Sequence, residues 1–68
     1  MTSIRLLLLH AKIAQQVVAV LTSDGKWWSG KVEKIEDYHV QLRLETNILI
    51  HVPIAVIEEV SNPKQASR

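Results

Sequence analysis

The chain has 68 residues, of which 47% are hydrophobic, with no cysteine and a formal net charge of +1. A chain of this length forms one domain, which buries only about 60% of the surface that the unfolded chain exposes. The lack of cysteine excludes disulfides and thiolate zinc sites, two of the usual ways to stabilise so small a fold. We therefore expect the chain to gain stability by self-association.

Charge and hydropathy exclude further classes of protein. Eight basic residues against seven acidic ones are too balanced for a nucleic-acid binder that acts as a single copy. No apolar run reaches the length of about 18 residues that a membrane-spanning helix needs. His10 and Lys12 interrupt the leucine-rich start, so a signal peptide is not expected and we expect a cytoplasmic protein. The three histidines lie too far apart for a local metal motif, and we expect no metal and no cofactor.

The first expected element is an amphipathic helix over about residues 3–16. Thr2 and Ser3 are good N-cap residues, and the residues that follow are mostly good helix formers. One apolar stripe at helical spacing is predicted to face the core, and it comprises Ile4, Leu7, Leu8, Ala11 and Ala14. Three further aliphatic residues, Leu6, Leu9 and Ile13, are expected to widen this stripe.

Five short strands are expected between residues 17 and 60. Residues 17–22 form a β-branched apolar run, and residues 26–35 and 38–44 alternate between apolar and polar side chains. Residues 48–52 and 57–60 are short apolar segments. β-Branched runs and a period of two are typical of strands.

Alternation in residues 26–35 divides that strand into two faces. Trp27 and Trp28 are adjacent, so one is expected to face the core and the other the solvent. Lys34 is expected to share its face with Trp28. Gly30 is expected where the strand bends sharply, because a residue without a side chain permits close approach of another backbone.

Short polar stretches predict the three turns, at residues 23–25, 36–37 and 46–47, the last as a two-residue loop. Pro53 has no N–H to donate and is expected to break the strand ladder before a single turn at residues 54–56. Residues 61–68 are polar and are expected to form a flexible tail after a domain of residues 1–60. The predicted fold is mostly β, with an N-terminal helix and a five-stranded, strongly bent sheet that closes into a small barrel.

Two segments of the chain carry a family pattern. In the first, glycines five positions apart are followed by aliphatic residues, an acid and an aromatic residue, namely Gly25, Gly30, Val32, Ile35, Glu36 and Tyr38. In the second, residues 50–57 close one strand and lead through a short loop into a short aliphatic strand. Together these segments resemble the Sm/LSm family, and its Hfq-like branch in particular, over about residues 3–60.

The resemblance implies a non-catalytic, homomeric ring that binds single-stranded RNA, with single-stranded DNA as an alternative. In such a ring the fourth strand of one subunit pairs with the fifth strand of the next. An open five-stranded barrel has two unpaired edges, and exposed edges favour this pairing. The residues expected at the interface are Ile48, Leu49, Ile50 and Ile57, together with the outward-facing Trp27.

The resemblance also implies an RNA site. Tyr38 occupies the loop position where family members stack a base, and His51 occupies the second loop, where it is expected to contact a base or ribose. Contacts to phosphates are expected from Lys31, Lys34 and Arg43, and a contact on the helix face from Arg5 and Lys12.

Departures from the family pattern leave a second interpretation open. Val40 stands where Sm proteins carry a base-reading asparagine, and residues 50–52 retain only His51 of the Hfq-like aromatic-Lys-His signature. The alternative is an SH3-like barrel that serves as a protein-interaction or assembly module, with the exposed tryptophan as its anchor and without nucleic-acid binding.

An enzyme is not expected. The serines have no evident histidine and acid partners in the sequence. The adjacent acids Glu36-Asp37 and Glu58-Glu59 are expected to diverge, because neighbouring side chains in a strand point to opposite faces.

Overall fold

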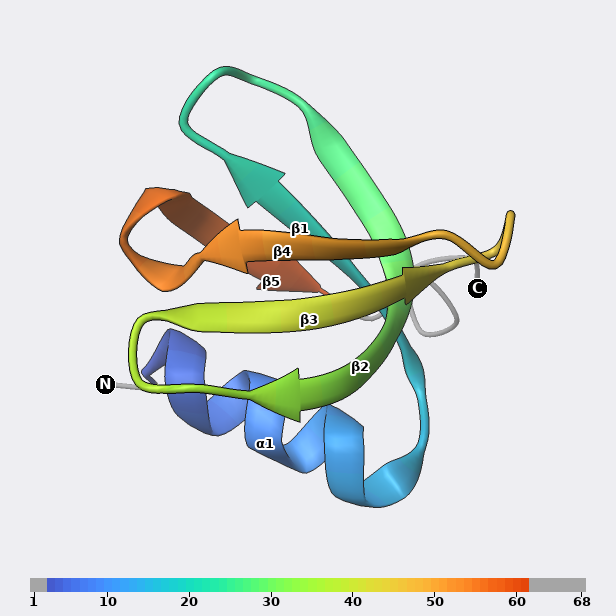
Figure 1. Cartoon of the computed structure of the whole chain (residues 1–68). Helices are drawn as coiled ribbons and strands as arrows, with labels where there is room; N and C mark the ends of the chain where they lie inside the picture. The colour runs from blue at the N-terminus through green and yellow to red at the C-terminus, as the bar shows by residue number, and fades with distance from the viewer. Residues whose placement is uncertain (1–2, 62–68) are drawn as a thin grey trace.

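The computed structural model describes residues 3–61, which contain one helix and five strands (Figure 1). In chain order the elements are α1 (Ile4–Ala14), β1 (Val17–Thr22), β2 (Trp27–Ile35), β3 (His39–Leu44), β4 (Leu49–Pro53), the 3-10 turn η1 (Ile54–Val56) and β5 (Ile57–Ser61). The strands form one antiparallel sheet in the order β4-β3-β2-β1-β5. The sheet is strongly bent but unclosed, with β4 and β5 as its two edges.

The predicted fold class is therefore confirmed, and the predicted elements agree with the observed ones to within two residues at each end. Ser61, which was expected to begin the tail, is the last residue of β5. The remainder of that tail, residues 62–68, lies outside the described residues. Within the described part of the chain, the single helix is too short to cross a bilayer.

Local hydrogen bonds set both ends of α1. The Ser3 hydroxyl accepts from the backbone N–H of Leu6 at 3.0 Å, as expected of an N-cap. At the other end, Gln15 has a left-handed backbone with φ of 56°. The N–H of Gln15 donates to the Lys12 carbonyl at 3.2 Å and the N–H of Gln16 to the Ala11 carbonyl at 3.0 Å. These bonds satisfy carbonyls that the end of a helix otherwise leaves free.

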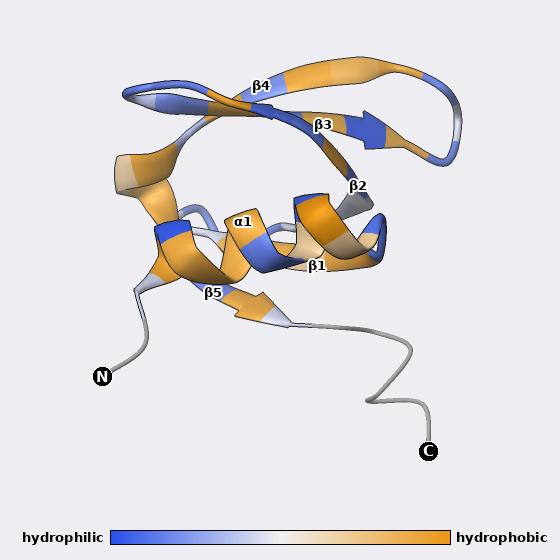
Figure 2. Cartoon of the chain, turned by 90° about the horizontal axis from the view of Figure 1, so that it is seen from below, coloured by the Kyte–Doolittle hydropathy of each residue, from blue (hydrophilic) through white to orange (hydrophobic). Residues whose placement is uncertain are grey.

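The helix has two apolar faces. Its inner face buries Leu8 and Ala11 against the sheet. Leu6, Leu9 and Ile13 are instead 46%, 42% and 73% exposed. The prediction that these three widen the core stripe is wrong, because a turn of about 100° per residue carries them to the opposite side of the helix. Figure 2 looks onto α1 from outside the barrel and shows hydrophobic residues on the helix.

The core lies between α1 and the concave face of the bent sheet. Four side chains in it are fully buried, namely Leu8, Val20, Val40 and Leu42. Each contributes about 1.5–3 kcal/mol relative to an exposed position. The other buried hydrophobic residues are Ala11, Val18, Val32, Val52 and Ile57.

Two irregularities in β2 produce the bend. A Cβ built on Gly30 would lie 2.5 Å from the Arg43 carbonyl oxygen on β3, which confirms that the strands approach closely there. A bulge between Val32 and Lys34 then shifts the register against β3. As a result Lys34 is exposed on the outer face, and the prediction that it shares the face of Trp28 is wrong.

The β1–β2 and β3–β4 hairpins close through four-residue loops, residues 23–26 and 45–48, and the third residue of each loop has a positive φ. That residue is Gly25 in the first loop, with φ of 84°, and Asn47 in the second, with φ of 69°. The loop predicted as the two residues Thr46-Asn47 thus also includes Glu45 and Ile48. Asn47 is tolerated because asparagine adopts the left-handed conformation more readily than most residues.

Pro53 does not end the ladder early. It is the last residue of β4 and lies opposite His39 on β3. Proline is tolerated at this position because β4 is an edge strand, where a missing N–H costs least. The predicted single turn at residues 54–56 follows directly as η1.

Candidate nucleic-acid interface

Four of the five predicted RNA-binding residues share the outer face of β2, β3 and β4. Lys31 on β2 lies opposite Arg43 on β3. Lys34 lies opposite Gln41, and Gln41 lies opposite His51 on β4. Antiparallel pairing places directly opposed side chains on the same face of a sheet. The structure therefore gathers these cations and His51 in two neighbouring cross-strand rows.

Acidic residues of the same face neutralise part of its charge. Arg43 Nε donates to Glu33 Oε2 at 3.2 Å, and Arg43 Nη1 donates to the Asn47 carbonyl at 3.4 Å. Lys34 Nζ lies 3.8 Å from Glu36 Oε2. These pairs are partly exposed, so each contributes little to stability.

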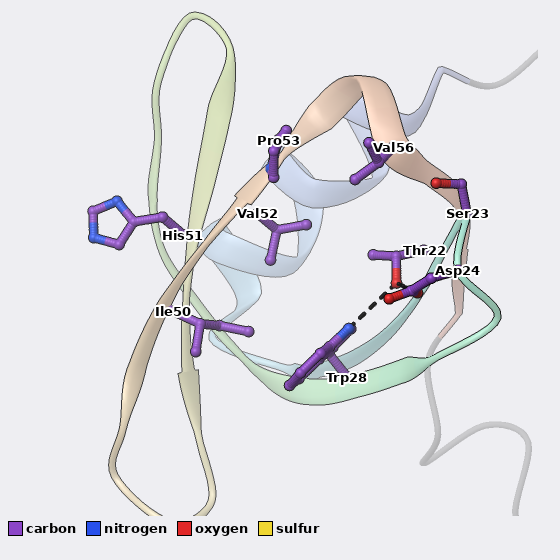
Figure 3. Close-up of a pocket in the computed structure, with 9 residues that line it drawn as sticks. All are labelled: Thr22, Ser23, Asp24, Trp28, Ile50, His51, Val52, Pro53 and Val56. Atoms are coloured by element: carbon purple, nitrogen blue, oxygen red, sulfur yellow. Dashed lines mark hydrogen bonds between the residues drawn. The ribbon is translucent and has the colours of Figure 1, made fainter.

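Lys31 is the cation of this face that is available to a ligand. Within residues 3–61 its ammonium group makes no ion pair or hydrogen bond. His51 is also exposed, and in Figure 3 its ring points away from the neighbouring cavity.

Tyr38 lies at the end of this face, in the turn between β2 and β3. Its side chain is 79% exposed, while its backbone carbonyl accepts from the N–H of Ile54 at 2.9 Å. This bond fixes the turn against η1. Tyr38 lies three residues before Gln41, which pairs with His51, so its backbone lies about 10 Å along the chain from that pair.

Arg5 joins the helix to the same turn. Its Nη2 donates to the Glu36 carbonyl at 2.8 Å and its Nη1 to the Asp37 carbonyl at 3.3 Å. Sequence reasoning missed this role, because no spacing rule connects a helix residue to carbonyls more than thirty positions away. Lys12 is exposed in the last turn of α1, where a positive charge interacts favourably with the helix dipole.

The two tryptophans point in opposite directions, as predicted. Trp27 is 51% exposed and lies opposite Leu21. Trp28 packs against the core, and its Nε1 donates to Thr22 Oγ1 at 3.3 Å.

A cavity of about 330 Å³ opens beside Trp28 (Figure 3). It is lined by Thr22, Ser23, Asp24, Trp28, Ile50, His51, Val52, Pro53 and Val56. The buried hydroxyl of Thr22 donates to Asp24 Oδ1 at 2.6 Å. This hydrogen bond, with a second from the N–H of Lys26, holds the pKa of Asp24 below its ordinary value of 3.8. The sequence marked residues 23–25 only as a turn, so this polar network was not predicted.

The two sheet edges carry most of the predicted interface residues. Leu49 and Ile50 are half-buried on β4, and Ile48 is exposed just before that strand. Ile57 is buried in the core, so it offers its backbone to the β5 edge rather than its side chain. Glu58 and Glu59 are exposed on the same strand.

The described residues contain no cluster of three or more histidine, aspartate or glutamate side chains that could hold a metal ion.

A helix followed by a bent, unclosed sheet of five antiparallel strands is the Sm-like fold. The structure is similar to a crystal structure of the pleiotropic translational regulator Hfq, with a TM-score of 0.74 and 22% sequence identity. The match covers 81% of this chain and 90% of that one. No family model and no curated protein matches the sequence. The predicted resemblance to the Hfq-like branch is therefore confirmed at the level of the fold.

Proposed function

We propose that the protein is a cytoplasmic, non-catalytic RNA-binding protein that assembles into a homomeric ring. The observation that carries this proposal is that the outer face with Lys31, Lys34 and Arg43 on β2 and β3 continues through His51 onto β4, which is a free edge of an Sm-like sheet. Pairing β4 of one copy with β5 of the next would repeat that face around the ring.

The ring follows from the two free edges. Unpaired strand edges expose backbone donors and acceptors that favour pairing with another chain. The β4 edge carries Leu49 and Ile50, with little charge to prevent pairing. A closed cycle satisfies both edges of every copy and leaves no free end.

RNA binding follows from repetition of a modest charge. In one copy, Glu36 pairs with Lys34 and Glu33 pairs with Arg43, which leaves Lys31 as the excess charge, so the face of a single chain is only weakly positive. Copies arranged around a ring would sum that excess into a belt able to attract phosphates. Tyr38 would stack a base, and His51 would contact a base or ribose.

Fluorescence anisotropy with short labelled RNAs tests RNA binding. We expect a U-rich or an A-rich RNA to bind more tightly than micromolar at low salt, with affinity falling as salt rises. Tyr38→Ala should weaken binding about tenfold, because stacking on an aromatic side chain contributes about 1–3 kcal/mol per base. Tyr38→Phe keeps the aromatic side chain that stacks on a base and serves as the matched control.

Lys31 gives a second readout in the same titration. Lys31→Ala should reduce the magnitude of the slope of log affinity against log salt by about 0.7 per site contacted, as expected for one lost phosphate contact. RNAs of both kinds that bind no more tightly than micromolar at low salt would contradict the proposal.

One observation favours a second candidate function, a protein-assembly module. Trp27 is half exposed on the outer surface, and tryptophan is enriched at the centres of protein interfaces. Under this alternative the protein would bind neither the U-rich nor the A-rich RNA. Trp27→Ala would abolish assembly with its protein partner while leaving the fold intact.

A further inference from the structure

The outer face of α1 carries an apolar stripe that the sheet does not use. It consists of Leu6, Leu9 and Ile13, all exposed and on the side of the helix opposite the core. Their spacing of three and then four residues is that of the a and d positions of a heptad, which form the contact line between two packed helices. The helix therefore has one apolar stripe that packs on the sheet and a second apolar stripe that is exposed.

A hollow of about 400 Å³ lies beside the N-terminal half of this stripe. It is lined by Ser3, Arg5, Leu6, Leu9 and Ile35, so it runs between α1 and the end of β2. A hollow next to an apolar stripe can receive a side chain from a partner, as in the packing of knobs into holes. A flat lipid surface would have no side chain to fill it.

Charge decides which partner fits. The helix carries Arg5, His10 and Lys12 and no acidic residue. On a helical projection, Arg5 and Lys12 flank one side of the stripe and His10 flanks the other. The acids Glu36 and Asp37 lie beyond Arg5. The surface near Arg5 is therefore closer to acidic residues than the surface near Lys12.

Like charge disfavours the two occupants that the chain itself could supply. Two copies packed stripe to stripe would bring Arg5 and Lys12 of each copy close to the cations of the other. Residues 62–68 contain Lys64 and Arg68, no acid and no large apolar residue. The complementary occupant is apolar along one line and acidic along its flanks.

We propose that the outer stripe of α1 docks an acidic amphipathic helix of a partner protein. Leu6, Leu9 and Ile13 would contact the apolar line of the partner helix, one of its apolar side chains would enter the hollow, and its acids would face Arg5 and Lys12. This surface is separate from the sheet edges and from the outer face of β2, β3 and β4.

A synthetic peptide tests this proposal on the full-length chain. The probe is a three-heptad helix with leucine at a and d and glutamate at e and g, and its control has lysine in place of every glutamate. We expect fluorescence anisotropy to detect binding of the glutamate peptide, weakened by salt, and no binding of the lysine peptide. Leu9→Ser should weaken binding about tenfold, since one large apolar contact is lost.

Two variants separate docking from an effect on folding. Ala14→Ser lies on the same helix away from the stripe and should leave binding unchanged, with the helical circular dichroism of both serine variants unaltered. Lys12→Glu should weaken binding of the glutamate peptide and allow the lysine peptide to bind. An unfolded variant could not give that opposite pair of changes.

Three results would overturn the proposal. The first is absence of glutamate-peptide binding at about 100 μM peptide, where even a weak helix contact is detectable. The second is binding to phosphatidylglycerol vesicles, lost in Leu9→Ser, in place of peptide binding, which would make the stripe a membrane-contact surface. The third is a solution mass of the assembly that Leu9→Ser reduces to half. That result would make the occupant of the stripe a second copy of the chain.

Discussion

Asp24 is the described residue whose ionisation is most clearly linked to the fold. The Thr22 hydroxyl and the N–H of Lys26 both donate to its carboxylate and hold its pKa below the ordinary value of 3.8. A carboxyl whose pKa is lower in the folded state stabilises the protein above its unfolded pKa. That stabilisation is lost as the pH falls through the folded pKa.

We therefore predict that Asp24→Asn makes stability less dependent on pH in the acid range. Asparagine keeps a hydrogen-bond acceptor but does not titrate, so the variant should be less stable than the parent at neutral pH and should approach it as the pH falls below 3.8. Urea unfolding at a series of pH values measures this. A difference in midpoint that stays constant at every pH would contradict it.

Gly30 is required by the contact between two strands. A Cβ there would lie 2.5 Å from the Arg43 carbonyl oxygen and 2.9 Å from its carbon, both backbone atoms that cannot move aside freely. Gly25 has a positive φ but nothing within 4 Å of its Cβ position. The two glycines therefore serve different physical needs.

We predict that Gly30→Ala lowers the free energy of unfolding by about 3 kcal/mol or more, as overpacking against backbone does. Gly25→Ala is the matched control, and it should cost about 1 kcal/mol for a strained φ. Chemical denaturation of both variants at one protein concentration gives the comparison. Equal losses would show that the close approach of β2 and β3 is not what requires Gly30.

At the level of elements, the link between α1 and the β2–β3 turn depends on Arg5. Arg5→Ala removes both hydrogen bonds to the turn and should cost about 1 kcal/mol, at the low end for bonds to a charged group because the site is exposed. Amide exchange in α1 and in residues 36–38 should accelerate.

Arg5→Lys is the control, because a single ammonium group cannot reproduce the two-pronged contact of a guanidinium. It should recover less than the full loss. An Arg5→Ala variant with unchanged stability and exchange, but weaker RNA binding, would assign Arg5 to the ligand instead of to the turn.

The elements were largely predictable because each depends on local patterns. Ser3 as an N-cap, the alternation after Tyr38 and the turn at Gly25 are all readable from short stretches of sequence. The bulge beside Lys34 was not readable, because it depends on the register between two strands. The outer stripe of α1 was also misread, since a chain rich in aliphatic residues does not reveal which line of a helix meets the sheet.

At the scale of the whole molecule, the basic face illustrates the same limit. The sequence identified Lys31, Lys34 and Arg43 as equivalent candidates. The fold distinguishes them, because the register brings Glu33 beside Arg43 and the turn brings Glu36 beside Lys34, while Lys31 lacks such a partner among residues 3–61. Charge pairing depends on which residues become neighbours across strands, and composition does not contain that information.

The two free edges connect the fold to the proposed function. β4 and β5 end the sheet without partners in a single chain, and pairing them between copies would also repeat the weakly positive outer face. RNA binding and assembly are thus expected to stand together, since a separated subunit carries too little charge to retain a polyanion.

Native mass spectrometry of the full chain with a short RNA, U-rich or A-rich, tests both parts at once. We predict one dominant species whose mass is a single integer multiple of the chain, shifted by the mass of bound RNA at low salt. A monomer, with or without RNA, would contradict the ring. A closed assembly that acquires neither RNA would contradict the RNA-binding function.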